Sequence, residues 1–358
     1  MRRAKRNWGL WTLGAVALGV CGLVSVASAG VTDISTERSG SMIVFPKVIF
    51  ATINGVTTDT VIQITNTGNP TVLARCFYID ASVSGECNET DFDIFLTRQQ
   101  PTLWVVSEGR STRRLDQGFP PGLVPAMPLG FQGELKCIQV DDSGAPMPTN
   151  VLKGEATLRR STGDVSEYNA IAFQGNPQAS SAIGNDISLN LSQGASGSLS
   201  GEFSACPNTL IMNHFADGVT DPVIDELGTC TRGDCPIRTE LTLVPCQEDL
   251  ENQVPGRVTV QFQIFNEFEQ QFSASTTVAC WLNAPLSRIA SVLTASGTLG
   301  STTMQTRITP NPGNGGVIGV AEEIRRDSNT EGPGAYAAFN LHTEGTRSGI
   351  DHVVLPAQ

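Results

Sequence analysis

The stretch Val61-Ile62-Gln63-Ile64-Thr65-Asn66-Thr67-Gly68-Asn69-Pro70 shows the pattern that decides the fold of this chain. Its first five residues are rich in β-branched side chains, and Asn, Gly and Pro follow directly. β-Branched side chains favour extended backbone, whereas Asn, Gly and Pro favour turns. The stretch therefore predicts a short strand over residues 61–65 that ends in a turn.

The same pattern recurs along the chain and predicts an all-β protein. Further strands are expected at 42–45, 92–96, 103–106, 134–140, 154–158, 240–244, 258–265, 273–281 and 317–321. The 36 glycines and 20 prolines interrupt these runs at intervals that suit antiparallel β-sandwiches. Helix signals occur at residues 221–228 and at 283–285, where a short helix would begin.

Residues 1–29 have the composition of a secretory signal peptide. Four basic residues precede an apolar run over 8–26, and Ala27-Ser28-Ala29 ends it with the small residues typical of a cleavage site. We expect the mature protein to begin near Gly30 and to be secreted, periplasmic or extracellular, with no stable membrane insertion. Lipid anchoring at Cys21 is disfavoured because Val20 precedes it and apolar residues continue afterwards.

A change of composition divides the mature chain. Residues 174–204 are rich in Gly, Ser, Asn and Ala, which is typical of a flexible linker or a long surface loop. The expected order is a signal peptide (1–29), a first β-sandwich domain (30–173), the linker or loop (174–204) and a second β-sandwich domain (205–358). Each sandwich would be antiparallel and immunoglobulin-like or jelly-roll-like. A weak internal repeat supports this division, since Pro46, Gln63 and Cys76-Phe77 are matched in order by Pro245, Gln263 and Cys280-Trp281.

Export would place eight cysteines in a compartment where disulfides persist. They are Cys76, Cys87, Cys137, Cys206, Cys230, Cys235, Cys246 and Cys280. The pairing we expect is Cys76–Cys87, Cys206–Cys246, Cys230–Cys235 and Cys137–Cys280, although spacing alone leaves other pairings open. If all eight are paired, at least one bridge joins the two halves, because three precede the linker and five follow it. A zinc site is disfavoured because Cys230 and Cys235 are too widely spaced and no second pair matches them.

The charge balance excludes some classes of partner. Loss of the leader would remove four basic residues and no acidic ones, which changes the net charge from −12 to −16. Nucleic acid and anionic lipid bind clustered Lys and Arg, so neither is expected as a partner. No cofactor is predicted; structural calcium is the one alternative. Oxygen ligands occur at 88–93 and 141–144, but neither segment matches a twelve-residue calcium loop, and turn chemistry explains both.

No motif predicts catalysis. His214 lies three residues before Asp217, yet the chain has no Gly-x-Ser-x-Gly elbow to supply a nucleophile, so we interpret His214 as a hydrogen-bonding loop residue. Glu322 and Glu323 are adjacent, and neighbouring strand residues point to opposite faces, so we interpret them as a solvated edge. No glycine-rich phosphate loop leads from a strand into a helix. The sequence thus predicts no catalytic, cofactor-binding or metal-binding residue.

Two segments could mediate interactions. Residues 118–131 combine prolines, which exclude a central strand, with large apolar side chains that need cover. This segment either folds over its own sandwich or forms an interaction loop, whose residues would be Phe119, Leu123, Val124, Met127, Leu129 and Phe131. Arg232-Gly233-Asp234 between two cysteines looks like an integrin-binding tripeptide, but so short a match is weak. A sugar-binding face would need exposed aromatics such as Trp104, whereas Phe77 and Trp281 are expected in the core.

Residues 62–67, followed by Cys76-Phe77-Tyr78-Ile79-Asp80, resemble the opening of secreted proteobacterial β-sandwich proteins of unknown activity. The resemblance extends loosely to residues 239–246 and to Cys280-Trp281. It implies an exported bacterial setting and a fold type, and it supplies no functional residue.

We therefore predict a secreted or envelope-associated structural or binding protein. Its ligand is not indicated; another protein or a glycan at the cell surface would suit it. The alternatives are a carbohydrate-binding or adhesion module and an exported hydrolase of unrecognised type. A hydrolase would need a pocket with two convergent titratable groups.

Overall fold

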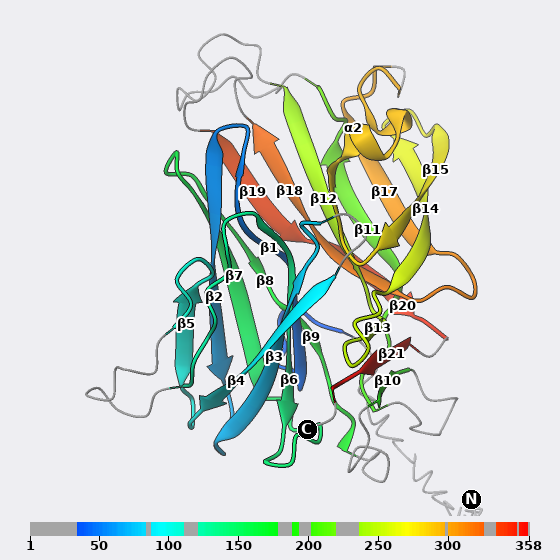
Figure 1. Ribbon diagram of the computed structural model, residues 1–358. Helices are drawn as coiled ribbons and strands as arrows, with labels where there is room; N and C mark the ends of the chain where they lie inside the picture. Colours follow the sequence, from blue (N-terminus) through cyan, green and yellow to red (C-terminus); the bar gives the residue numbers. More distant parts are fainter. Residues whose placement is uncertain are drawn as a thin grey trace, which may run out of the picture. The chain divides into compact units, whose positions relative to one another are not determined.

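The computed structural model describes residues 34–83, 87–110, 121–177, 188–192, 202–219, 236–297, 300–325, 334–348 and 351–356. Across these ranges the protein consists of sheets that are antiparallel except for the β13–β21 pair, with very little helix, which confirms the predicted all-β fold class (Figure 1). Contacts group Val31–Gln358 into one unit. The division into two tandem domains and the signal peptide stay predictions.

The first half of the chain forms a nine-stranded sheet. Its strands are β1 (Met42–Ile53), β2 (Val56–Asn66), β3 (Val72–Asp80), β4 (Asn88–Leu96), β5 (Pro101–Val105), β6 (Phe131–Val140), β7 (Leu152–Arg160), β8 (Val165–Asn169) and β9 (Ile171–Phe173). The order is β4-β3-β6-β1-β2-β7-β8, with β5 also paired to β2 and β9 to β1. Asn54 and Gly55, both at positive φ, form the tight β1–β2 turn. An Asn-Gly pair is a strong hairpin signal because both residues tolerate this conformation.

The two parts of this sheet enclose the first hydrophobic core. Side chains from β1, β3 and β6 meet side chains from β2, β5 and β7, with Phe45, Ile62 and Leu135 fully buried among them. Trp104 also lies there and donates its indole N–H to the Tyr78 hydroxyl at 2.6 Å. Strands β1 and β6 are buried along most of their length, so both faces of this part of the sheet are covered.

The second half contributes two further sheets. The strands of one are ordered β15 (Gln271–Ala279), β14 (Arg257–Asn266), β17 (Thr303–Pro310), β11 (Pro207–Phe215) and β20 (His342–Thr346). Those of the other are ordered β16 (Leu282–Pro285), β12 (Ile237–Pro245), β18 (Val317–Arg325) and β19 (Ala335–Asn340). A second core, which includes Leu243, Phe262 and Ile308, joins residues of both sheets. The short helices α2 (Leu286–Ile289) and η3 (Ser291–Leu293) pack against it.

A third core lies where the two halves meet. It combines Met42 and Ile138 of the first sheet with Ile318 of β18 and with residues of a three-stranded sheet. That sheet consists of β10 (Ser188–Leu191), β21 (Asp351–Val354) and β13 (Glu248–Asp249). Part of the predicted linker 174–204 thus forms strand β10, and much of the remainder lies outside the described residues.

Each of the ten predicted strands overlaps an observed strand. Strands such as β11 and β17 were missed because polar residues interrupt their apolar pattern. Residues 283–285 belong to strand β16, and the predicted helix begins directly after Pro285 as α2. Residues 221–228 lie outside the described residues. The proposed repeat is not reflected in strand pairing, since β1 and β2 form a hairpin whereas β12 and β14 lie in different sheets.

The cysteines among the described residues form three disulfides, Cys76–Cys137, Cys87–Cys280 and Cys206–Cys246. The Cys206–Cys246 pairing is confirmed, whereas the predicted Cys76–Cys87 and Cys137–Cys280 pairings are wrong. Cys76 lies directly opposite Cys137 in the β3–β6 register, while the neighbour of Cys76 on β4 is Phe92. Cys87 therefore reaches Cys280, and this bridge joins the two halves as expected. Cys230 and Cys235 lie outside the described residues.

We predict that replacing Cys87 and Cys280 together with Ser lowers the free energy of unfolding by roughly 2–4 kcal/mol. The bridge joins residues 193 positions apart in the chain. Without it the unfolded chain gains conformational entropy, which lowers the stability of the folded state. Denaturant unfolding of the variant and of the oxidised wild type measures the difference. Thiol labelling under denaturing conditions should find no free cysteine in the wild type, and labelling of Cys87 or Cys280 there would contradict the bridge.

Candidate functional site

Strand β20 is the last strand of its sheet in the described part of the chain. It pairs with β11, and beyond its end Arg347 donates its backbone N–H to the Cys206 carbonyl at 2.9 Å. Backbone groups alternate in direction along an antiparallel strand. The backbone N–H and C=O groups of Thr343 and Gly345 therefore point towards β11, whereas those of His342 and Glu344 point away from it.

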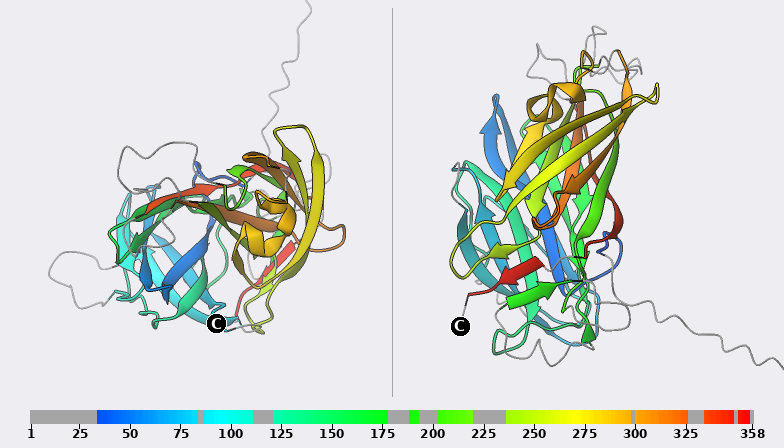
Figure 2. Two further views of the ribbon diagram at one scale, coloured as in Figure 1. Left: turned by 90° about the horizontal axis from the view of Figure 1, so that it is seen from above. Right: turned by 90° about the vertical axis from the view of Figure 1, so that its right-hand side faces the viewer.

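Two adjoining hollows, of about 370 and 350 Å³, are lined by residues of β20 and of the segment 34–38 that precedes β1. Figure 2 shows the surrounding sheets as backbone ribbons. They share Ile34 and Thr343, and we call them together the edge groove. The larger hollow has Ile34, Ile171, Leu210, Ile318 and Leu341 among its apolar lining residues, and Ser35, Thr36, Glu37, Asn340, His342 and Thr343 among its polar ones. The smaller one is lined by Ile34, Arg38, Ala205, Pro207, Thr343, Gly345 and Thr346. Both volumes lie within the range of small-ligand sites.

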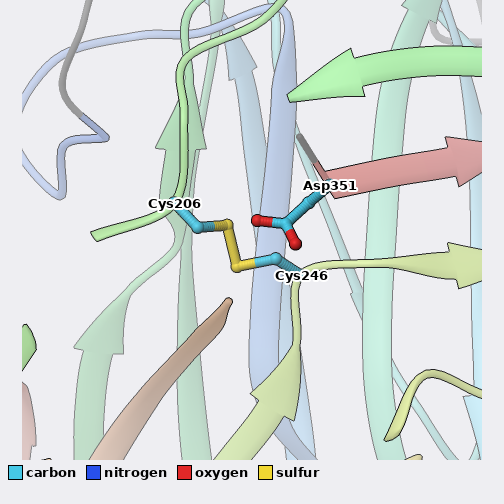
Figure 3. Close-up of side chains that lie close together, drawn as sticks. All are labelled: Cys206, Cys246 and Asp351. Carbon is cyan, nitrogen blue, oxygen red and sulfur yellow. A yellow bond between two sulfur atoms is a disulfide. The ribbon is translucent and has the colours of Figure 1, made fainter. Parts of the chain in front are cut away.

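A disulfide and a buried carboxylate anchor the strands beside the edge groove (Figure 3). Cys206 precedes β11, Cys246 follows β12, and Asp351 begins β21. Asp351 accepts the backbone N–H of Gly316 at 3.0 Å and pairs with the Arg347 guanidinium at 3.3 Å. Burial raises the pKa of Asp351, while these two partners act to lower it. The anchor thus joins the ends of β11, β12 and β20 and the start of β18.

The same three residues have the spacing of a metal site, since Asp351 and both sulfur atoms lie within 4.8 Å of one another. Metal binding by cysteine requires a thiolate. Because the two sulfur atoms are joined in a disulfide, this cluster is a structural anchor in the oxidised protein.

The edge groove contains hydrogen-bonding groups but no assembled nucleophile and base. The Ser35 hydroxyl accepts the backbone N–H groups of Glu37 and Arg38, at 3.1 and 3.0 Å. Among the described residues His342 makes no hydrogen bond to Ser35 or Glu37, and the Arg38 guanidinium has no ion-pair partner. The sequence carried no signal for this site, because its residues come from five separate segments and form no motif.

His214 is a buried strand residue, which corrects its interpretation as a loop residue. It lies on β11, and its ring nitrogens are 2.8 Å from the Thr306 hydroxyl and the Phe215 carbonyl. Burial lowers the pKa of His214 to about 4, so the ring is neutral at pH 7. Both nitrogens are engaged within the fold, which gives His214 a structural role.

Glu322 is not part of a solvated edge. Strand β18 lies between β12 and β19, and Glu322 is only 1% exposed, whereas Glu323 points to the other face and pairs with Arg325. The opposite orientation of the two side chains was predicted correctly. The burial of Glu322 could not be predicted, because the first half of the chain covers it.

Glu322 belongs to a buried ionic cluster that connects the halves. Lys47 of β1 lies 2.9 Å from Glu322 and 3.2 Å from Glu240, and Arg160 of β7 also pairs with Glu322. Burial alone would raise the pKa of Glu322, but Lys47 and Arg160 lower it to about 2. Burial likewise acts to lower the pKa of Lys47, and the two carboxylates raise it. Glu322 and Lys47 are therefore both charged at neutral pH.

A second buried cluster has a different charge balance. Lys136 of β6 lies 2.7 Å from Glu134 and 2.5 Å from Glu248 of β13. One cation thus faces two carboxylates, and one oxygen of Glu134 has no hydrogen-bond partner in the described structure. Burial raises the pKa of Glu134 to about 8, although Lys136 opposes this. Burial in the fold therefore favours the protonated form of Glu134.

The predicted interaction loop is only partly exposed. Val124, Met127 and Phe131 are buried in the first core, whereas Leu123 and Leu129 are about 60% exposed. Phe119 and the tripeptide 232–234 lie outside the described residues. A role of this loop in binding stays a prediction.

Trp104 and Trp281, the tryptophans among the described residues, occupy different environments. Trp104 is buried and packs edge-on against Phe92, so it offers no surface for a sugar ring. Trp281 is only partly buried at the junction of the halves, where its indole N–H bonds the Pro46 carbonyl at 2.7 Å. Phe77 is fully buried, as predicted.

The segments considered for calcium have ordinary structural roles. Residues 88–93 lie in strand β4, which corrects their interpretation as a turn. Asp141 accepts hydrogen bonds from the Ser143 hydroxyl and from the backbone of Ser143 and Ala145, which lowers its pKa and closes a turn. Among the described residues no helix is long and apolar enough to span a bilayer.

No family model matches this chain, and no curated protein matches it. A Thermotoga maritima structure is 10% identical and covers 40% of this chain and 98% of its own, with a TM-score of 0.26. The CupB6 tip adhesin from Pseudomonas aeruginosa is 10% identical over 89% of this chain and 94% of its own, with a TM-score of 0.14. A Pleurotus ostreatus lectin in complex with GalNAc is 12% identical over 86% of each chain, with a TM-score of 0.12. These scores are too low to support an inference about function.

We predict that Glu322→Gln lowers the free energy of unfolding by about 3 kcal/mol, because it leaves Lys47 and Arg160 without their shared buried partner. The matched control is Glu323→Gln on the opposite face, which should cost about 0–1 kcal/mol. Denaturant unfolding at neutral pH measures both variants. Equal losses for the two variants would show that the buried cluster contributes no more than a surface pair.

We also predict that stability falls as the pH rises from about 6 to about 8. The pKa of Glu134 is higher in the folded state than in the unfolded chain, so folding favours the protonated acid and stability is lost as the pH rises through the folded pKa of about 8. Glu134→Gln keeps a neutral side chain and should reduce this pH dependence. Unfolding midpoints at the two pH values test the effect, with the exposed Glu344→Gln as control. If the Glu134→Gln variant showed the same pH dependence as the wild type, the raised pKa of Glu134 would not be its cause.

Proposed function

We propose that this protein is an extracytoplasmic binding module with a structural or recognition role at the cell envelope, and that the edge groove is its ligand site. The observation that carries the proposal is the pair of adjoining hollows beside the outer edge of β20. Three disulfides support an oxidising compartment outside the cytoplasm.

The surroundings of the groove favour binding because they are held in place before a ligand arrives. The Cys206–Cys246 bridge and Asp351 anchor the strands beside it, and the Lys47 cluster and Cys87–Cys280 hold the two halves together. A preformed site binds more tightly because less conformational entropy is lost on association.

An exported hydrolase remains the second candidate because Glu37 and His342 line the same hollow. Hydrolysis through a nucleophile would need a hydroxyl hydrogen-bonded to a base. In the described structure the Ser35 hydroxyl instead accepts two backbone N–H groups of its own turn. This arrangement favours binding over hydrolysis.

A carbohydrate ligand is less well supported than a polypeptide. No Phe, Tyr or Trp side chain is among the described lining residues of either hollow, and Trp104 is buried. Sugar rings commonly pack on exposed aromatic faces, whereas backbone groups at a strand edge bind other backbone groups.

The test is selection of ligands by the purified, oxidised protein from a phage-displayed random peptide library and from a glycan array. Thr343 lines both hollows, so Thr343→Trp should fill the edge groove and abolish capture. Ser275→Trp, on the exposed strand β15 of the same sheet, is the matched control and should capture the same ligands as the wild type. Equal capture by Thr343→Trp would place binding elsewhere, and hydrolysis of a captured ligand would favour the second candidate.

A further inference from the structure

We propose that the ligand of the edge groove is an extended peptide that adds to β20 as a further strand and places a carboxylate against Arg38. This inference rests on the proposed binding function and specifies the class of partner. It follows from three features of the groove: its backbone groups, its apolar floor and its uncompensated charge.

The backbone of β20 offers the hydrogen bonds that strand addition needs. The register with β11 leaves the N–H and C=O groups of His342 and Glu344 directed away from the sheet. An exposed strand edge binds extended peptides through such groups. The strand has five residues and no proline, so an extended segment of about equal length, roughly 17 Å, can follow it.

The floor of the larger hollow provides a place for one side chain of the peptide. Ile34, Leu210 and Ile318 contribute apolar surface there, while Thr343 lies at the boundary with the smaller hollow. Alternate side chains of a strand point the same way. A bound strand would therefore direct one apolar residue into the larger hollow and the next residue on that face towards the smaller one.

The smaller hollow has a positive charge and no acidic lining residue. Arg38 is the charged residue among those that line it in the described structure, and its guanidinium has no ion-pair partner there. Arg347, which follows the lining residue Thr346 in the chain, is already paired with Asp351. An acidic side chain or a terminal carboxylate would complement Arg38 by a charge-assisted hydrogen bond.

Edge strands are usually protected against unwanted pairing by charges, bulges or cover. The charged side chain of Glu344 on β20 is paired with Arg307 of β17. The segment that lies near the edge of β20, and that would have to cover it, is 34–38. This segment forms no β-bridge with β20 in the described residues; Ser35 instead pairs with Ala172 of β9. The hollows between segment and strand are thus open to an added strand.

The experiment uses the peptides that the library selection recovers, synthesised and labelled for binding measurements. Glu344→Pro removes one outward N–H, and proline is tolerated on an edge strand when its N–H would face away from the sheet. The matched variant Glu344→Ala keeps the N–H and loses the same ion pair. We expect Glu344→Pro to bind at least about tenfold more weakly than Glu344→Ala. Unchanged thermal melting of both variants shows that they fold.

Two further measurements test the remaining parts of the inference. Peptide binding to the wild type should slow amide hydrogen exchange in residues 342–346. The recovered peptides should share an acidic residue or a free carboxyl end, and Arg38→Gln should weaken binding of the acidic peptide more than that of its amide analogue. Equal binding by Glu344→Pro and Glu344→Ala, or capture of glycans alone, would overturn strand addition while leaving the binding function intact. Failure to capture any peptide or glycan would overturn both.

Discussion

Burial of the first sheet on both of its faces is the constraint on which the rest of the structure depends. Strands β1 and β6 are covered on one face by β2, β5 and β7 and on the other by the second half of the chain. Any charged residue on these strands must therefore find a partner inside the protein, because an unpaired buried charge is very costly. Lys47 and Lys136 find theirs on β12, β13 and β18. The position of the second half follows from these pairings.

The two buried lysines contribute more to specificity than to net stability. Desolvation offsets much of the attraction within a buried ion pair, so an apolar replacement of similar shape can be equally stable. A displaced second half, however, would leave Lys47 without a carboxylate and Lys136 with Glu134 of its own strand alone. The Cys87–Cys280 bridge and the Trp281 hydrogen bond to Pro46 act at the same junction. Together these contacts select one arrangement of the halves.

The edge groove is a by-product of this arrangement. Its walls come from the segment before β1, from β9, from β11 and β20, and from β18. The Cys206–Cys246 bridge and Asp351 hold the strands beside it, and Gly316 is required there because a Cβ atom would lie 2.5 Å from the Cys206 Cβ atom. A site assembled from such distant segments is rigid only if the halves are held together. The junction between the halves and the proposed binding role are therefore linked.

The sequence by itself determined the local properties of the protein. Runs such as 61–65 and 258–265 combine β-branched and aromatic residues between turn formers, and this combination favours strands wherever the chain places them. Only the tertiary structure decided which strands are neighbours and which faces are buried. Cys76 pairs with Cys137 because β3 lies beside β6, Glu322 is buried because β1 and β7 reach it, and the groove exists because residues 34–38 lie beside β20. Each of these contacts joins residues far apart in the chain, and strand propensity depends on near neighbours alone.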